Sequence, residues 1–216
     1  MTGSRRYRYG VLLALIAISL AFQLAVPVAD WSRLVTLVLQ GATLVLALRT
    51  SRVRPLIVRV AAAVVAVAFV ASLIAVVSGG DVGSDSTILT NLLLVGLAPA
   101  AIAVGVVRNF REDRVVTVAT MFGVLCIYLL LGMFFAFVYG TINALGSTEV
   151  FAQHVDPTQA DFLYFSFTTL TTTGYGDLTA ATGVGRAMAI TEALIGQVYL
   201  VTVVAAIVSN LRPRHA

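Results

Sequence analysis

Charged residues are scarce in this chain, and lysine is missing altogether. Only 11 % of the 216 residues are charged and 59 % are hydrophobic, whereas a soluble globular domain carries about 25 % charged residues. So few charged residues cannot cover the surface of a soluble domain of this length, which argues against a soluble enzyme and against a disordered tail. A disulfide scaffold is excluded because Cys126 is the single cysteine. The composition predicts an integral membrane protein.

The few charges also fail to form a recognisable site. No metal cluster, phosphate loop or nucleophile–base pair stands out in the sequence, so we expect no enzymatic activity and no cofactor. The net charge is +4, but the arginines sit in short clusters between apolar runs. Nucleic-acid-binding proteins gather basic residues on one face or helix instead. We therefore expect no nucleic-acid partner and interpret the clusters as topology signals beside membrane lipid.

Six apolar runs meet or approach the length of about 20 residues that crosses a hydrocarbon core of about 30 Å. They are residues 11–28, 31–48, 56–77, 88–107, 115–139 and 187–208. The predicted fold class is an all-α membrane protein with six transmembrane helices. The first run has an alternative interpretation as a cleaved secretory signal, which fits less well because Pro27 would stand where the cleavage site needs a small residue.

The arginines indicate how these six runs are oriented. With a cytoplasmic N-terminus, every arginine except Arg33 and Arg186 falls in a cytoplasmic segment, as the positive-inside rule requires. We therefore expect an integral protein of the plasma membrane with both termini in the cytoplasm.

The connection between the last two runs, residues 140–185, is too long for a simple turn. It contains a short apolar and aromatic segment, residues 162–170, which cannot cross the bilayer and predicts a re-entrant half-helix. Pro157 and the Thr158-x-x-Asp161 pattern predict its start, because Pro is favoured in a first turn and the pattern resembles a capping box.

The half-helix is followed by the sequence Thr-Thr-Thr-Gly-Tyr-Gly-Asp, residues 171–177. Gly174 and Gly176 can adopt positive φ angles, which residues with a Cβ resist. Alternation of left- and right-handed backbone lets successive carbonyls point to one side, and such oxygens replace the hydration shell of a cation. One chain supplies one column of oxygens, so a ring of oxygens requires four chains around an axis.

This segment resembles the selectivity filter of the tetrameric potassium channel family, and the resemblance extends over roughly residues 115–210. It implies a pore domain at residues 115–216, preceded by a four-helix transmembrane domain at residues 1–114. It also implies a homotetramer with K⁺ as the permeant ion. By resemblance, K⁺ would bind the backbone carbonyls and one hydroxyl of the filter residues Thr172, Thr173, Gly174 and Tyr175, and Gly176 would complete the turn.

The resemblance also implies supporting roles, with some departures from the family pattern. Asp177 would form a hydrogen bond behind the filter, and Tyr164, where many relatives carry Trp, is its expected partner. Thr173 replaces the usual Val, and its hydroxyl needs a partner, for which Thr168, Thr169 and Thr171 are available. Gly196 resembles the gating hinge of the inner helix.

Glu192 is an acid inside the last apolar run, and such a residue is a functional candidate by default. It either faces the pore cavity and attracts cations or braces the back of the pore helix through the threonines. We favour the bracing role, because an acid paired away from the pore needs no water.

The first four runs have the layout of a voltage-sensing domain without its charges. Voltage sensing requires several charges that move through the field, each contributing about 2.3 kcal/mol per 100 mV. Residues 88–107 contain no Arg or Lys, and Arg108, Arg111 and Arg114 lie beyond them. We expect weak or no voltage dependence.

The sequence leaves three alternatives open. The chain could form a weakly selective monovalent cation channel, because Thr173 and the altered partner of Asp177 could loosen the filter. It could be a subunit of an ion-coupled potassium transporter, although those proteins tend to fuse four pore repeats in one chain. The third alternative is a non-conducting membrane scaffold, which would tolerate Gly174→Ala.

Overall fold

The chain is described here from a computed structural model, in which residues 2–27, 29–50, 55–77, 118–146, 149–153 and 156–205 are placed. The helices are α1 (Thr2–Ala25), α2 (Asp30–Thr50), α3 (Pro55–Val77), α5 (Val118–Leu145), α6 (Gln159–Leu170) and α7 (Gly183–Val198). The π-helix η1 (Tyr199–Val204) continues α7 directly. Within these ranges the only β pairing is an isolated bridge between Phe151 and Ala180. The prediction of a mainly helical protein is confirmed.

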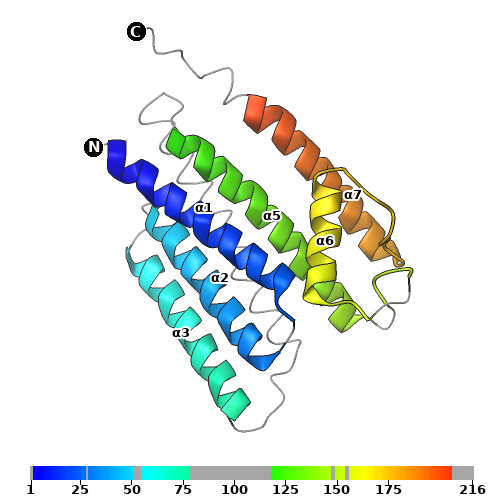
Figure 1. Cartoon of the computed structure of the whole chain (residues 1–216), viewed down its shortest axis with the longest axis horizontal. Helices are drawn as coiled ribbons and strands as arrows, with labels where there is room; N and C mark the ends of the chain where they lie inside the picture. Colours follow the sequence, from blue (N-terminus) through cyan, green and yellow to red (C-terminus); the bar gives the residue numbers. More distant parts are fainter. Residues whose placement is uncertain are drawn as a thin grey trace.

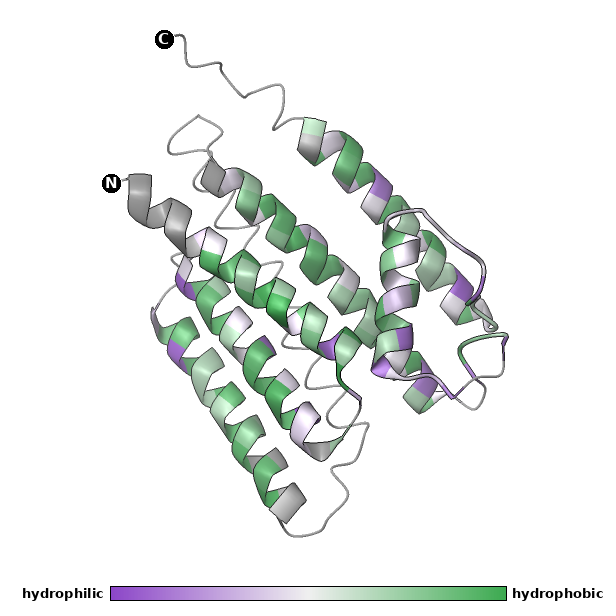
Figure 2. Cartoon of the chain, in the orientation of Figure 1, coloured by the Kyte–Doolittle hydropathy of each residue, from purple (hydrophilic) through white to green (hydrophobic). Residues whose placement is uncertain are grey.

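Five of the six predicted runs coincide with α1, α2, α3, α5 and α7, and the run at residues 88–107 lies outside the described residues. Among the described residues, three helical stretches are long and apolar enough to cross a membrane: Trp31–Thr50, Thr120–Leu145 and Gly183–Val203. The apolar stretches Tyr9–Ala25 and Pro55–Val70 are shorter. Hydrophobic residues extend along most of the length of these helices (Figure 2).

The helices lie side by side in the order α3, α2, α1, α5, with α6 between α5 and α7 (Figure 1). Helix α1 runs along α5 and also contacts α6. Its buried residues Tyr9, Leu12 and Ile16 belong to the same core cluster as Cys126 and Leu130 of α5. The first helix therefore packs against α5 and α6 of its own chain.

The start of α1, the start of α5 and the end of η1 lie at one end of the molecule (Figure 1). At the opposite end α1 turns into α2, where Phe22 and Trp31 make an edge-to-face contact with ring centroids 6.1 Å apart. The two helices also share a buried hydrogen bond from Gln40 to Gln23. Helices α2 and α3 pack closely because Gly41 has no side chain: a Cβ there would lie 2.3 Å from Val65.

Candidate functional site: a short helix and a glycine-containing loop

The N-terminus of α6 carries the capping box that the sequence predicts. The backbone N–H of Thr158 donates to the Asp161 carboxylate (2.8 Å), and the Asp161 N–H donates back to the Thr158 hydroxyl (3.4 Å). These two bonds satisfy orphan donors at the helix start. The predicted short apolar segment, residues 162–170, lies within α6.

The chain enters and leaves this segment at the same place. Phe151 pairs with Ala180, and backbone hydrogen bonds join Ala152 to Thr179 and Ala181 to Val150, each at 2.9 Å. The Gln153 amide reinforces the pairing, because it accepts from the Thr179 N–H and donates to the Thr179 hydroxyl, each at 3.0 Å. The paired segments lie at one end of the helices. The polypeptide between them comprises α6 and the loop after it, and it therefore begins and ends at the same place.

The backbone of the loop after α6 alternates in handedness. Thr172, Gly174 and Gly176 have φ angles of +57°, +53° and +82°, and no other described residue has a positive φ. For the two glycines this conformation is accessible. For β-branched Thr172 it costs on the order of 1–3 kcal/mol, a strain that persists only where the surroundings impose it and that clusters at functional sites.

The loop turns its first amides toward α6. The N–H of Thr172 donates to the Thr169 carbonyl (2.9 Å), and the N–H groups of Thr173 and Gly174 both donate to the Thr168 carbonyl (2.8 and 3.1 Å). Residues 171–177 are nevertheless all exposed in the single chain. The loop is thus anchored through its amides and lies on the surface of the chain.

Thr168 supports the loop through its backbone carbonyl, which accepts the amides of Thr173 and Gly174. Its hydroxyl donates within the helix to the Phe165 carbonyl (3.0 Å). Of the three threonines available to the Thr173 hydroxyl, Thr171 is the partner, with the two oxygens 2.9 Å apart. The hydroxyl that replaces the usual apolar side chain at position 173 is therefore satisfied within the chain.

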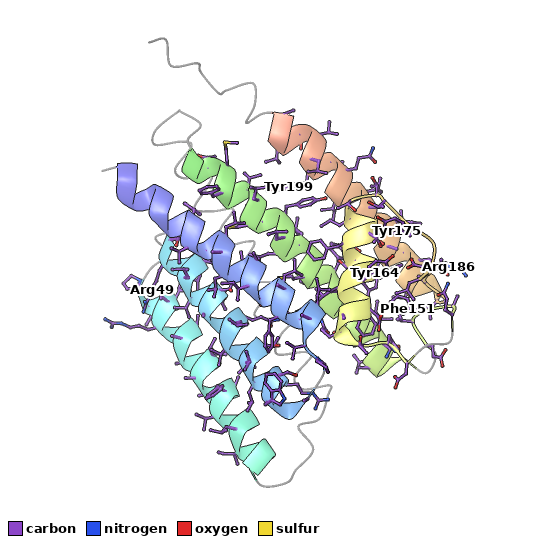
Figure 3. All side chains as sticks on the ribbon, in the orientation of Figure 1. Arg49, Phe151, Tyr164, Tyr175, Arg186 and Tyr199 are labelled. Atoms are coloured by element: carbon purple, nitrogen blue, oxygen red, sulfur yellow. The ribbon has the colours of Figure 1, made fainter. Side chains whose placement is uncertain are left out.

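Tyr164 links α6 to the far end of the loop. Its hydroxyl donates to the Asp177 carboxylate at 2.7 Å, and its ring stacks on Tyr175 with centroids 6.3 Å apart and planes 7° from parallel. Figure 3 shows these two tyrosines side by side. The hydrogen bond lowers the pKa of Asp177 and raises that of Tyr164 to about 12. The contact therefore holds Asp177 ionised.

Glu192 of α7 lies behind α6 and is fully buried. The Tyr139 hydroxyl of α5 donates to Glu192 Oε2 at 2.6 Å, and Ser166 Oγ of α6 lies 2.5 Å from Glu192 Oε1. Ser166 Oγ is also 2.7 Å from the Gly132 carbonyl of α5. The prediction of threonine partners is wrong, because a serine and a tyrosine contact Glu192. Its bracing role stays a prediction.

Gly196 permits the closest approach between α7 and the end of α6. A Cβ at this position would lie 2.1 Å from the Leu170 backbone oxygen. The hydroxyl of Tyr128 donates to the same oxygen at 3.3 Å. Gly196 therefore has a packing role that does not follow from the resemblance, and its hinge role stays a prediction.

The π-helix η1 begins three residues after Gly196, at Tyr199. The Tyr199 ring stacks on Tyr128 with centroids 5.7 Å apart, and its hydroxyl donates to the Val124 carbonyl at 2.8 Å. Tyr199 points from the end of α7 toward α5 (Figure 3).

Sequence reasoning missed Ser166, Tyr139 and Gly132. Ser166 and Gly132 are short residues in apolar helices and carry no distinctive pattern. Tyr139 is the last residue of the fifth apolar run, where the sequence does not distinguish it from the other aromatic residues. The one available signal is Glu192, because a buried acid in a membrane helix requires polar partners on the neighbouring helices.

One comparison with known proteins covers the residues of this site. A sequence family described as ion channel matches residues 123–212, which include most of α5 and all of α6, the loop and α7. No curated protein and no solved structure matches the chain significantly. This part of the chain is therefore similar to an ion-channel family. Together with the apolar helices this indicates an integral membrane protein, and it favours a role other than catalysis.

Proposed function

We propose that the chain is the subunit of a homotetrameric, potassium-selective channel that conducts K⁺ passively down its gradient. The observation that carries the proposal is the alternating backbone of Thr172, Gly174 and Gly176 within the sequence Thr-Thr-Gly-Tyr-Gly-Asp. Alternating handedness directs successive carbonyls to one side, and rings of such carbonyls replace the hydration shell of K⁺.

The exposure of the loop supports an assembly of several chains. The loop amides are turned toward α6 while residues 171–177 remain exposed, and the Tyr175 side chain is 71 % exposed. Non-helical backbone at membrane depth is tolerated only where protein buries it or where it lines a water-filled cavity. Four copies around an axis provide both conditions, with α6 as a re-entrant helix and the loop as the filter.

The outer face of α7 also supports this assembly. Within one chain, only 17 % of an 18-residue segment of the apolar stretch Gly183–Val203 is buried. The corresponding share for the stretch Thr120–Leu145 in α5 is 50 %. Large apolar side chains account for much of the exposed face: Val184, Ile190, Leu194 and Val198 of α7 and Val201 of η1. In the proposed tetramer α7 is the inner helix, and neighbouring subunits cover part of this face while lipid contacts the outside of α3.

The proposed setting is the plasma membrane, with both termini in the cytoplasm. The starts of α1 and α5 and the end of η1 share one end of the molecule, and the loop approaches the other end (Figure 1). This arrangement is the one that six spans with a re-entrant segment require. In the proposed channel the mouth lies beside Thr179 on the outside.

The test is the reversal potential of the purified protein in liposomes with K⁺ on one side and Na⁺ on the other. We expect a reversal potential close to the K⁺ equilibrium value. A potential near zero contradicts potassium selectivity and supports the weakly selective channel. Transport that requires a second ion gradient supports the transporter alternative.

Gly174→Ala is the matched variant for this experiment. A Cβ at position 174 meets nothing within 4 Å in its own chain, so within one chain the substitution acts only through its φ of +53°. We expect loss of K⁺ flux. Gly183→Ala is the control, because its Cβ also meets nothing within 4 Å and Gly183 has no positive φ. Equal flux in both variants contradicts the proposed filter.

A further inference from the structure

A chain of polar groups lies buried where α5, α6 and α7 meet. Its centre is the fully buried carboxyl group of Glu192. Three short oxygen–oxygen contacts make up the chain: Tyr139 to Glu192 (2.6 Å), Glu192 to Ser166 (2.5 Å) and Ser166 to the Gly132 carbonyl (2.7 Å). Each of these distances is that of an O–H···O hydrogen bond.

The available hydrogens are too few for these three contacts if Glu192 is ionised. Tyr139 and Ser166 each supply one hydroxyl hydrogen, whereas a carbonyl and a carboxylate only accept. Ser166 lies between two acceptors and can donate to one of them only. A third hydrogen completes the chain if it resides on Glu192. The acid O–H then donates to Ser166, Ser166 donates to Gly132, and Tyr139 donates to the other carboxyl oxygen.

The surroundings of Glu192 favour the neutral acid for a separate reason. Among the described residues no basic side chain pairs with it. The titratable groups that face it are two tyrosines of α5, namely Tyr139 and Tyr128. The α6 partner, Ser166, does not titrate in this range. A buried carboxylate without a counter-charge is costly, and such a group takes up a proton instead.

This chain of hydrogen bonds passes through α6, the helix that carries the loop proposed as the filter. Ser166 belongs to α6 and lies two residues before Thr168, whose carbonyl accepts the amides of Thr173 and Gly174. The Ser166 contact with Gly132 is therefore an anchor that ties the end of α6 to α5. When Glu192 loses its proton to solvent, Ser166 turns its single hydrogen to the carboxylate and the contact with Gly132 is lost.

We propose that Glu192 is a proton-binding site: its bound proton locks α6 between α5 and α7, and release of the proton at high pH unlocks α6 and reduces conduction. Glu192 acts as a positioning residue, because it reaches the loop only through Ser166 and α6. The effect on conduction rests on the proposed channel function. The protonation state does not.

The protonation state is measured by infrared spectroscopy of the full chain reconstituted in lipid. We expect the wild-type minus Glu192→Gln difference spectrum to contain the C=O stretch of a protonated carboxylic acid at neutral pH. The band shifts in D₂O and disappears as the pH is raised. Its absence at neutral pH overturns the proposal, whether or not the protein conducts.

Ser166→Ala keeps the proposal testable if Glu192→Gln does not assemble. This substitution removes the acceptor of the acid proton, so the C=O stretch of Glu192 moves to higher frequency relative to the wild type. An unchanged band overturns the proposed chain of hydrogen bonds.

Conduction is measured as K⁺ flux into liposomes over the same pH range. Once the pH exceeds the midpoint, the protonated fraction falls about tenfold per pH unit, and we expect wild-type flux to fall at least as steeply. In Glu192→Gln the flux no longer changes across that range, because the amide carries no titratable proton. The exposed acid Asp156 provides the control, and Asp156→Asn keeps the wild-type pH dependence.

The two failures are distinguishable. If the wild type carries no K⁺ flux at any pH, the proposed function fails and the infrared band still decides the protonation state. If the wild type conducts and Glu192→Gln keeps the same pH dependence, the proton-binding site is overturned as the origin of the effect.

Discussion

At the scale of single residues, the Tyr164–Asp177 hydrogen bond holds the end of the loop against α6. Because this bond lowers the pKa of Asp177, its stabilisation is present above the ordinary pKa of an aspartate, about 3.9. The stabilisation is lost as the pH falls through the lowered value. The loop is therefore predicted to keep this anchor at neutral pH and to lose it only in strong acid.

Tyr164→Phe and Asp177→Ala test this anchor as a pair. Each variant is expected to reduce steady-state K⁺ flux, because each leaves the end of the loop without its side-chain partner on α6. The double variant is expected to lose no more than the more severe single variant, since both remove one contact. Liposome flux measurements check this, and strictly additive losses contradict a shared contact.

Thr179 is predicted to make the proposed mouth a poor site for tetraethylammonium. It is not aromatic, and its N–H and hydroxyl are both held by Gln153. Aromatic side chains attract such quaternary ammonium cations through their ring faces. We expect weak external block in the wild type and stronger block in Thr179→Tyr, measured as inhibition of K⁺ current. No gain in block argues against placing the mouth at Thr179.

At the scale of elements, the crossing of α7 over the end of α6 depends on Gly196. An added methyl group would meet a backbone oxygen, which cannot move without displacing the helix. We expect Gly196→Ala to destabilise the assembly by about 1–3 kcal/mol, the usual cost of overpacking. The measurement is thermal unfolding of the solubilised protein.

Gly10→Ala is the control for this substitution. Gly10 also lies in a helix, but its added Cβ would make ordinary contacts of 3.7 Å with Phe122. Alanine has the higher helix propensity by about 1 kcal/mol, so this variant is expected to be as stable as the wild type or more so. A stable Gly196→Ala protein with altered gating would favour the hinge role over the packing role.

At the scale of the whole molecule, the first helix belongs to the same packed unit as the proposed pore. Tyr9, Leu12 and Ile16 of α1 share a core with α5, and α1 also reaches α6. The first part of the chain therefore supports the helix that carries the loop. The sequence division at residue 114 separates the predicted functions, but the packed core extends across it.

Voltage dependence is also a property of the whole molecule. The predicted run at residues 88–107, which contains no Arg or Lys, lies outside the described residues, so this prediction rests on sequence. With few charges to move through the field, we expect a nearly linear current–voltage relation in symmetric K⁺. The measurement is single-channel recording in planar bilayers, where a steep dependence of open probability on voltage contradicts the prediction.

The sequence by itself determined the membrane class, the helical segments, the capping box of α6 and the loop that follows it. These features depend on local composition, on periods of a few residues and on the conformational freedom of Gly174 and Gly176. Only the tertiary structure decided which side chains meet across helices. It placed Ser166 and Tyr139 on Glu192, brought Gly196 against Leu170 and packed α1 on α5. Such contacts join residues far apart in the chain, and their choice depends on how helices pack, which no local pattern specifies.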